Sequence, residues 1–448
     1  MMNIILLSGG SGKRLWPLSN ETRSKQFLKL MKNENSVYES MIQRVYRQIK
    51  ASHDNANVVI ATGKAQADLI KSQLNNKVDV VLEPERRDTF PAIALASSYF
   101  FYKRGMDLED VLLVLPVDPF ADKEYFEILL EMEKVVRSNI AKISLMGIKP
   151  TYPSAKYGYI TPKQDPVANN FSCTKVASFH EKPSEEYAEQ LIQNGAVWNG
   201  GVFAFRLGYL IDKIREYVDF NSYEELESKY SELPKISFDY EIVEKELSIA
   251  MVEYQGVWKD LGTWNTLTEV MDETSIGKVI VSEDCINTHV INELDIPIIV
   301  LGGRDLIVAA SPDGILISDK HQSSYLKPYV DTIHQRPMYE ERRWGEYKVI
   351  DYVEYPDGTL SLTKHLIIKA GKKISYQSHY LRDEVWTFVD GFGELTIDGH
   401  VTKVKRGDVV SIGIGTKHTV KANSDSDLRF IEVQIGSELS ESDIRKYD

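Results

Sequence analysis

Short apolar runs alternate with amphipathic stretches over the first 272 residues of the chain. The apolar runs have the length of buried strands, and they fall at residues 3–7, 57–61, 79–82, 110–115 and 142–148. Between them, apolar residues recur with helical spacing at 36–50, 64–74 and 90–104. This alternation predicts a Rossmann-like α/β domain over residues 1–272, with a mixed, mostly parallel sheet.

The pattern changes after residue 272. Short β-rich pieces at 278–281, 288–291, 298–301, 306–309 and 314–318 predict a small β module and linker over residues 273–330. From residue 331 to 448, strands of five to eight residues are separated by glycine and aspartate turns. Such spacing is typical of a compact all-β barrel or double-sheet fold, so we expect three domains in all.

Composition narrows the functional classes. The formal net charge of −13 argues against general binding to nucleic acids or anionic membranes, because nothing offsets repulsion by phosphates. An anionic substrate would need a local basic pocket. The only cysteines, Cys173 and Cys285, cannot form a disulfide framework and fit a reducing compartment. We see no signal peptide and no apolar run of about 18 residues, and we therefore expect a cytoplasmic protein.

A glycine-rich turn follows the first apolar run. Gly9, Gly10 and Gly12 stand between this strand and two basic residues, Arg14 and Lys25. Glycines let backbone N–H groups converge on phosphate oxygens, and the basic side chains can neutralise the charge. The turn lacks the ending of a P-loop and does not continue as a dinucleotide fingerprint. A phosphate site is one interpretation, and a plain tight turn is the other.

Several motifs along the chain resemble one family. They are SGGSGKRLWPLS (8–19), KQFL (25–28), EP (83–84) with RDT (87–89), LPVD (115–118), YGYI (157–160), FHEKP (179–183), WNGGVF (198–203), FDY (238–240) and WKDLGTW (258–264). In this order they resemble the mannose-1-phosphate guanylyltransferases, which are sugar-nucleotide nucleotidyltransferases. The resemblance implies that a sugar phosphate attacks the α-phosphorus of a nucleoside triphosphate. Such a reaction needs cations gathered around phosphates.

The resemblance also implies roles for particular residues. It implies a catalytic set of Arg14, Lys25 and Asp118, and a Mg²⁺ site at Asp118 and Asp260. The implied nucleotide-binding residues are Ser8, Gly9, Gly10, Gly12, Lys13, Arg14, Glu83, Asp88 and Thr89. The implied sugar-binding residues are Gly158, Glu181, Lys182 and Asn199. The plainer alternatives are a turn at Asp118, a helix cap at Asp260 and surface turns at the sugar motifs.

Some positions depart from the family pattern. Asp88 stands where asparagine is usual, Lys13 replaces threonine and Ser24 replaces proline. Gly200 replaces serine, and Pro119-Phe120 replaces a histidine and an aliphatic residue. The residues at the implied phosphate and metal positions match the family pattern, whereas several residues near the implied base and sugar sites differ from it. Nucleotidyl transfer is therefore the firmer expectation, and GTP and mannose 1-phosphate are the less firm one.

The C-terminal part resembles the cupin domain that follows the transferase in type II phosphomannose isomerase/guanylyltransferase enzymes. The matching stretches are SYQSHYLRDEVW (375–386) and GIGTKH (413–418). They offer Gln377, His379, Glu384 and His418 as ligands for Zn²⁺ or another divalent metal. Leu381 and Val385 replace histidines, and Gly413 replaces a proline. The alternative is a structural or sugar-sensing barrel whose histidines are merely buried polar groups.

The resemblance thus implies an Mg²⁺-dependent nucleotidyltransferase that makes GDP-mannose and pyrophosphate from mannose 1-phosphate and GTP. A second expected activity is isomerisation of mannose 6-phosphate in the cupin domain. Two alternatives stay open: another nucleotide such as CTP or another sugar or polyol phosphate, and a non-catalytic regulatory protein that binds sugar nucleotides. We expect a homo-oligomer, a dimer, that binds neither nucleic acid nor membrane, and a place in polysaccharide biosynthesis.

Overall fold

The computed structural model describes residues 1–10, 12–20, 22–75, 77–166 and 172–447. By its internal contacts the chain divides into two compact units. The first comprises Met1–Leu15 and Ser24–Asp272, and the second comprises Trp16–Arg23 and Glu273–Asp448. Within the described ranges, no helix combines the length and the apolar character needed to cross a membrane.

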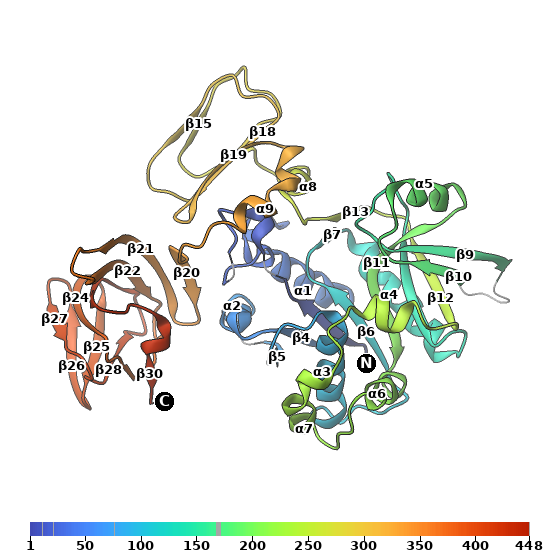
Figure 1. Cartoon of the computed structure of the whole chain (residues 1–448), viewed down its shortest axis with the longest axis horizontal. Coiled ribbons are helices and arrows are strands. Elements are labelled where there is room, and N and C mark those ends of the chain that lie inside the picture. The colour runs from blue at the N-terminus through green and yellow to red at the C-terminus, as the bar shows by residue number, and fades with distance from the viewer. Residues whose placement is uncertain (11, 21, 76, 167–171, 448) are drawn as a thin grey trace. The chain divides into compact units, whose positions relative to one another are not determined.

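A nine-stranded sheet forms the centre of the first unit (Figure 1). Its order is β5-β4-β1-β6-β11-β8-β12-β10-β9. The strands are β1 (Asn3–Ser8), β4 (Asn57–Gly63), β5 (Asp79–Glu83), β6 (Val111–Pro116), β8 (Ile143–Ile148), β9 (Tyr159–Pro166), β10 (Thr174–His180), β11 (Val197–Arg206) and β12 (Ile249–Tyr254). The first four in the order run parallel, whereas β11 pairs antiparallel with both β6 and β8. The carboxyl ends of four parallel strands therefore lie at one edge, where ligands bind in α/β sheets.

Helices cover both faces of this sheet. One apolar core contains Ile4 and Leu6 of β1 and side chains of α1 (Met41–Ser52), α2 (Ala67–Gln73), α4 (Lys123–Arg137) and α5 (Glu185–Gln193). The other contains Ile5 and side chains of α3 (Thr89–Tyr102), α6 (Leu207–Arg215) and α7 (Tyr223–Ser228). Because successive strand residues point to opposite faces, the two cores lie on opposite sides of the sheet.

Two short antiparallel strand pairs and one short helix also belong to this unit. β2 (Met31–Lys32) pairs with β3 (Tyr38–Glu39), and β7 (Pro119–Ala121) pairs with β13 (Trp258–Asp260). α8 (Trp264–Thr268) follows β13. The α/β class expected from the sequence is confirmed, but the first helix begins at Met41 rather than residue 36. Ser40 and Gln43 form a capping box that fixes this start.

The second unit begins with stacked short strands. β14 (Ser275–Ile276), β16 (His289–Asn292) and β18 (Leu306–Ser311) run parallel, and β19 (Gly314–Asp319) returns antiparallel beside β18. A separate parallel pair joins β15 (Val279–Val281) and β17 (Ile298–Val300). We call residues 273–319 the β module. A short helix, α9 (Lys327–Val330), follows it.

The remaining strands of the second unit form two packed antiparallel sheets (orange to red in Figure 1). One has the order β20 (Tyr339–Arg342), β21 (Gly345–Glu354), β22 (Leu360–Ile368), β29 (Leu428–Gly436), β24 (Arg382–Asp390) and β27 (Val409–Ile412). The other has the order β26 (His400–Lys405), β25 (Phe392–Ile397), β28 (His418–Ala422), β23 (Gln377–Ser378) and β30 (Arg445–Lys446). Trp386, Phe388 and Phe430 are buried in their shared apolar core. The expected β-rich C-terminal fold is confirmed.

Candidate functional site

A cavity of about 580 Å³ lies in the first unit at the carboxyl ends of the parallel strands. Most of the residues expected to bind nucleotide line it: Ser8, Gly9, Gly10, Glu83, Asp88 and Thr89, together with Asp118. Lys64 and Arg86 also line it and add positive charge that sequence motifs did not mark. Gly12, Lys13 and Arg14 are not among its described lining residues. The cavity is in the size range of small-molecule sites.

Polar side chains hold the glycine turn at the cavity edge. Thr62 Oγ1 donates to the Ser8 carbonyl at 2.8 Å, and Gln66 Nε2 donates to the Gly10 carbonyl at 3.3 Å. Gln26 Nε2 donates to Ser8 Oγ at 3.3 Å. Gly10 has a φ of 105°, which favours glycine. The donors from Thr62 and Gln66 engage carbonyl oxygens that would repel a phosphate. Gln26 belongs to a recognised motif, whereas no sequence signal marked Thr62 or Gln66.

Lys25 lies between the two aspartates expected to bind metal. Its Nζ is 2.7 Å from Asp118 Oδ2 and 3.7 Å from Asp260 Oδ1. The pairing of β7 with β13 sets Asp260 opposite Pro119, and this register brings the two aspartates together. The structure therefore gathers three residues from distant parts of the sequence at the cavity that Asp118 lines.

Lys25, Asp118 and Asp260 shift one another's pKa values. Burial lowers the pKa of Lys25, but the carboxylates of Asp118 and Asp260 raise it by more, so the ammonium stays charged. Burial raises the pKa of Asp118, but Lys25 brings it below its usual value. Asp260 differs, because burial and the Asp118 charge raise its pKa despite Lys25. Two half-buried carboxylates beside one lysine form a hard-oxygen donor set that fits a divalent cation.

Glu83, Asp88 and Thr89 form another wall of the cavity. Glu83 is buried, its Oε2 accepts a hydrogen bond from Tyr230 Oη at 2.9 Å, and burial raises its pKa. Asp88 is exposed, and its Oδ1 accepts from the Thr89 amide at 2.8 Å at the start of α3. Thr89 Oγ1 accepts from the Phe238 amide at 2.8 Å. These contacts fix a carboxylate-lined wall of the cavity.

The expected sugar-binding residues also lie together. A Cβ on Gly158 would stand 2.5 Å from Glu181 Oε2 and 2.9 Å from the Phe179 ring, so a larger residue there would have to displace both side chains. Lys182 Nζ pairs with Glu181. Asn199 Nδ2 donates to Asp239 Oδ1 at 2.7 Å. Asp239 was recognised as part of a motif but was not selected as a site residue.

Asp239 is the most perturbed carboxyl near these residues. It begins a short π-helix (Asp239–Val243), a form that often marks functional sites. Burial and the Glu181 charge raise its pKa to about 7. With Glu181 and Asn199, it provides hydrogen-bond acceptors and donors of the kind that hold sugar hydroxyls.

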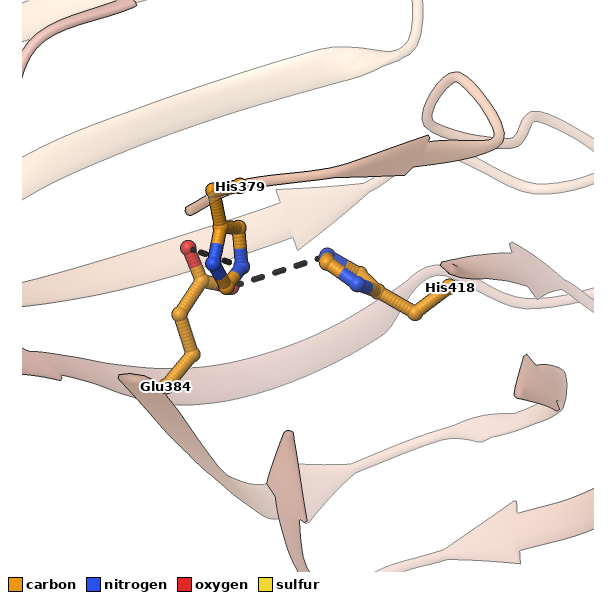
Figure 2. Close-up of side chains that lie close together, drawn as sticks. All are labelled: His379, Glu384 and His418. Carbon is orange, nitrogen blue, oxygen red and sulfur yellow. Dashed lines mark ion pairs between the residues drawn. The ribbon is translucent and has the colours of Figure 1, made fainter. Parts of the chain in front are cut away.

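Three expected metal ligands converge inside the C-terminal barrel (Figure 2). His379 follows β23, Glu384 lies on β24 and His418 begins β28, and their candidate ligand atoms lie within 4.8 Å of one another. His379 Nε2 is 3.2 Å from Glu384 Oε1, and His418 Nε2 is 3.8 Å from Glu384 Oε2. All three are almost fully buried.

The two histidines are oriented as metal ligands usually are. His379 Nδ1 donates to the Arg382 carbonyl at 2.8 Å, and His418 Nδ1 donates to the Thr416 carbonyl at 2.9 Å. In the neutral tautomer this leaves both Nε2 lone pairs toward Glu384. Neither Nε2 makes a well-formed hydrogen bond to a described residue. Burial lowers the pKa of His418, which favours the neutral ligand form.

The fourth expected ligand, Gln377, lies beside this group. It stands directly opposite His418 in the β23–β28 pairing, so the two side chains share a face of the sheet. Its Oε1 accepts a hydrogen bond from Ser375 Oγ at 2.8 Å. Gln377 is only half-buried, whereas the other three are buried.

Three other buried side chains donate hydrogen bonds to the Glu384 carboxylate. Arg382 Nε, Gln434 Nε2 and Trp386 Nε1 donate to its carboxylate at 3.0, 2.9 and 3.1 Å. Burial raises the pKa of Glu384, whereas His379 and His418 in their protonated forms, together with Arg382, bring it well below its usual range. Neighbouring Glu432 has a pKa raised to about 7 by burial and by the Glu384 charge. No expectation from the sequence covered Gln434 or Glu432.

Comparison with known proteins supports this organisation. Residues 3–275 match the nucleotidyl transferase family, and residues 331–448 match the mannose-6-phosphate isomerase C-terminal family. The chain is 30% identical to a mannose-1-phosphate guanylyltransferase of Salmonella montevideo, covering 100% of this chain and 98% of the relative. It is 29% identical to the mannose-1-phosphate guanylyltransferase of Escherichia coli K12, covering 99% of this chain and 97% of the relative.

A further relative and a solved structure agree. The alginate biosynthesis protein AlgA of Pseudomonas putida is 28% identical, over 100% of this chain and 96% of that protein. A crystal structure titled mannose-1-phosphate geranyltransferase, from Thermus thermophilus, superposes with a TM-score of 0.60 at 27% identity. It covers 74% of this chain and 98% of that one. The cavity, the Lys25 cluster and these full-length similarities together show that the chain is a sugar-phosphate nucleotidyltransferase that belongs to the mannose-1-phosphate guanylyltransferase family.

Proposed function

We propose that the protein converts mannose 1-phosphate and GTP to GDP-mannose and pyrophosphate, with Mg²⁺. The observation that carries the proposal is the cluster of Lys25 with Asp118 and Asp260 beside the nucleotide-sized cavity. A phosphate oxygen of the sugar phosphate attacks the α-phosphorus. The bond from that phosphorus to the bridging oxygen of the β-phosphate breaks, and pyrophosphate leaves.

In this proposal, basic side chains and backbone amides bind the phosphates and neutralise their charge. Glycine-turn amides and Arg14 hold the β- and γ-phosphates, and Lys25 meets the α-phosphate and the attacking phosphate. Asp118 and Asp260 offer the oxygen ligands that fit Mg²⁺, which when bound would neutralise developing charge on the phosphates. Lys64 and Arg86 add positive charge to the cavity wall.

Glu83 supports the choice of GTP. Guanine presents two adjacent donors, N1–H and the N2 amino group, and a carboxylate can accept both. The buried Glu83 carboxylate lines the cavity, and Tyr230 engages its Oε2. Adenine and the pyrimidines do not offer this donor pair to a carboxylate, so an ionised Glu83 favours guanine.

For the sugar, we propose that Glu181 and Asn199 accept and donate hydrogen bonds to neighbouring hydroxyls. Gly158 leaves room for the sugar because a side chain there would clash with Glu181. Lys182 pairs with the sugar phosphate, and Asp239 holds the Asn199 amide.

The test is a matrix of pyrophosphate release with GTP, ATP, CTP and UTP against several sugar 1-phosphates. The expected result is fastest turnover for GTP with mannose 1-phosphate, with GDP-mannose identified by mass spectrometry. A strong preference for another nucleotide or another sugar phosphate would reassign the specificity. Loss of turnover after chelation, restored by Mg²⁺, tests the metal requirement.

A second proposed activity is interconversion of mannose 6-phosphate and fructose 6-phosphate in the barrel. Its support is the buried convergence of His379, Glu384 and His418 (Figure 2). Gln377 lies on the same face as His418. These residues would hold Zn²⁺ or another divalent metal, which supplies polarisation of the open-chain sugar. Formation of fructose 6-phosphate that requires metal and is abolished in His379→Ala is the expected result.

We also propose that the product feeds the synthesis of a surface polysaccharide. Relatives of similar length are named for alginate and xanthan biosynthesis. A dimer is the proposed assembly, and sedimentation analysis of the purified chain tests it.

A further inference from the structure

The segment between the two proposed phosphate-binding cations is anchored in the second unit. We call residues 14–25 the signature loop, and the structure describes all of them except residue 21. Arg14 and Lys25 at its ends belong to the first unit, whereas Trp16–Arg23 groups with the β module by contacts. The chain therefore leaves the nucleotide-binding unit after Leu15 and returns at Ser24, directly before Lys25.

Arg23 makes the strongest of these anchoring contacts. Its Nη1 and Nη2 donate to Glu293 Oε2 and Oε1 at 2.8 and 3.0 Å, a bidentate pair. Its Nε is 3.6 Å from Glu341 Oε1, and its guanidinium lies 5.1 Å from the centre of the Tyr339 ring. Arg23 is only 9% exposed. Bidentate charge-assisted bonds fix orientation as well as distance, and burial protects them from screening by salt.

Three more contacts hold the rest of the segment. Asn20 Nδ2 donates to Asp313 Oδ2 at 2.7 Å, while its Oδ1 accepts from the Arg23 amide at 2.7 Å. Ser311 Oγ donates to the Pro17 carbonyl at 2.6 Å. Trp16 packs so closely on Gly314 that a Cβ there would lie 2.5 Å from the indole ring. Each contact joins the segment to β18, β19 or the turn between them.

This arrangement constrains Lys25 through the backbone. Only Ser24, which is fully buried, separates Arg23 from Lys25. The Lys25–Phe27 turn begins there, with the Phe27 amide donating to the Ser24 carbonyl at 3.0 Å. A shift of Arg23 must therefore move the Lys25 backbone or strain this turn. Reacting groups tolerate little displacement, and about 1 Å can cost about 100-fold in rate.

We propose that Arg23 and Glu293, with Ser311 and Asp313, are positioning residues that set Lys25 for nucleotidyl transfer. This inference rests on the proposed role of Lys25. The β module then serves catalysis as well as connecting two domains. Because Lys25 acts where charge develops at the α-phosphorus, its displacement should lower kcat more than it raises KM for GTP.

The test compares purified full-length Arg23→Gln, Glu293→Gln, the double variant, Arg23→Lys and Lys25→Ala. We expect each single glutamine variant to lower kcat about 10- to 100-fold, with KM for GTP changed less than about threefold. The double variant should be no slower than the singles, because both break one pair. Arg23→Lys should recover part of kcat, since lysine restores the charge but not the bidentate geometry.

Glu340→Gln is the matched control. Glu340 is a buried carboxylate of the same unit whose ion pair is with Arg342. It should lower the melting temperature while leaving kcat unchanged. Ser311→Ala, a milder variant, is expected to lower kcat about threefold if the charge variants fail to fold.

The outcomes separate the two proposals. If Lys25→Ala is inactive while Arg23→Gln and Glu293→Gln, or Ser311→Ala in their place, keep wild-type kcat, the pair is merely structural and the inference is wrong. If Lys25→Ala retains turnover, the proposed mechanism itself fails. A loss of kcat confined to the anchoring variants and Lys25→Ala, and absent from Glu340→Gln, supports both.

Discussion

Lys25 Nζ lies 2.7 Å from Asp118 Oδ2. The cation proposed to meet the α-phosphate is thus held by a carboxylate proposed to bind Mg²⁺. Pre-ordering of this kind lowers the reorganisation needed when charge develops on the phosphates. It also means that loss of Lys25 removes the nearest cation of both Asp118 and Asp260, whereas loss of Asp118 leaves Lys25 with Asp260 at 3.7 Å.

We therefore predict that Lys25→Ala and Asp118→Asn each lower kcat by about 100-fold or more while the chain stays folded. Lys134→Ala is the control, because Lys134 pairs with Glu131 at the same 2.7 Å on the surface of α4. Steady-state pyrophosphate release and circular dichroism are the measurements. Near wild-type turnover in both site variants would rule out this mechanism.

Glu83→Gln is predicted to weaken guanine selection. The carboxylate of Glu83 offers two acceptor oxygens to the two guanine donors. The glutamine amide replaces one of these oxygens with an NH₂ group, so one guanine donor would face another donor. We expect KM for GTP to rise about 10-fold or more, with a smaller change for other triphosphates. Tyr230→Phe is the control, because it removes the 2.9 Å bond to Glu83 but keeps the carboxylate. An unchanged ratio of GTP to ATP turnover in Glu83→Gln contradicts the assignment.

Much of the fold was predictable because its signals are local. Strand-length apolar runs and helical spacing identified the α/β unit, and turn residues identified the barrel. The start of α1 was misplaced, because apolar spacing alone continues through β3, whereas the Ser40 capping box begins the helix at Met41. Antiparallel β11, inserted between β6 and β8, depends on long-range pairing that no local pattern encodes.

The site was predictable only where a motif marked it. The resemblance grouped Asp118 with Asp260 as a metal site, but the β7–β13 register that joins the two aspartates was not visible in the sequence. Asp239 stood inside a motif without an evident role, because its partner Asn199 lies on a distant strand. No local sequence pattern marked Arg23 either, because its proposed role depends on its contact with Glu293, which is distant in the sequence.

Asp239 should make stability depend on pH. Its pKa is about 7 in the folded chain and 3.8 in the reference state, so the folded state binds more protons between these values. Stability therefore falls as pH rises from about 4 to 7 and is level above that. Asp239→Asn removes this dependence. We expect its free energy of unfolding, relative to wild type, to improve by roughly 1 to 3 kcal/mol between pH 4 and 8, allowing for partial exposure.

Urea unfolding followed by tryptophan fluorescence at several pH values is the measurement. Asp427→Asn is the contrasting control, because hydrogen bonds from the Ala370 amide and Lys369 lower the pKa of Asp427. That variant should lose stability above pH 4 instead of gaining it. A constant difference between Asp239→Asn and wild type across pH would show that Asp239 is ionised throughout.

Metal content is the direct test of the barrel site. We predict about one divalent ion per chain in wild type, and loss of that ion in His379→Ala and His418→Ala. Removal with a chelator should lower the melting temperature of the barrel transition, and metal at 100 times its Kd should restore about 2.7 kcal/mol. His365→Ala should keep the ion, because His365 lies on β22 next to inward-facing Lys364 and Leu366 and therefore faces outward. Elemental analysis of each purified variant decides the matter.

Glu384→Gln should behave differently from the histidine variants. In metal-free protein, the Glu384 carboxylate accepts bonds from Arg382, Gln434 and Trp386. Its neutral replacement leaves the buried Arg382 guanidinium without its closest carboxylate, a change that typically costs about 3 to 5 kcal/mol. We therefore expect Glu384→Gln to destabilise the chelated protein more than His379→Ala does. Equal stability of the two chelated variants would mean that Glu384 serves the metal alone, and that the Arg382 contact contributes little to the fold.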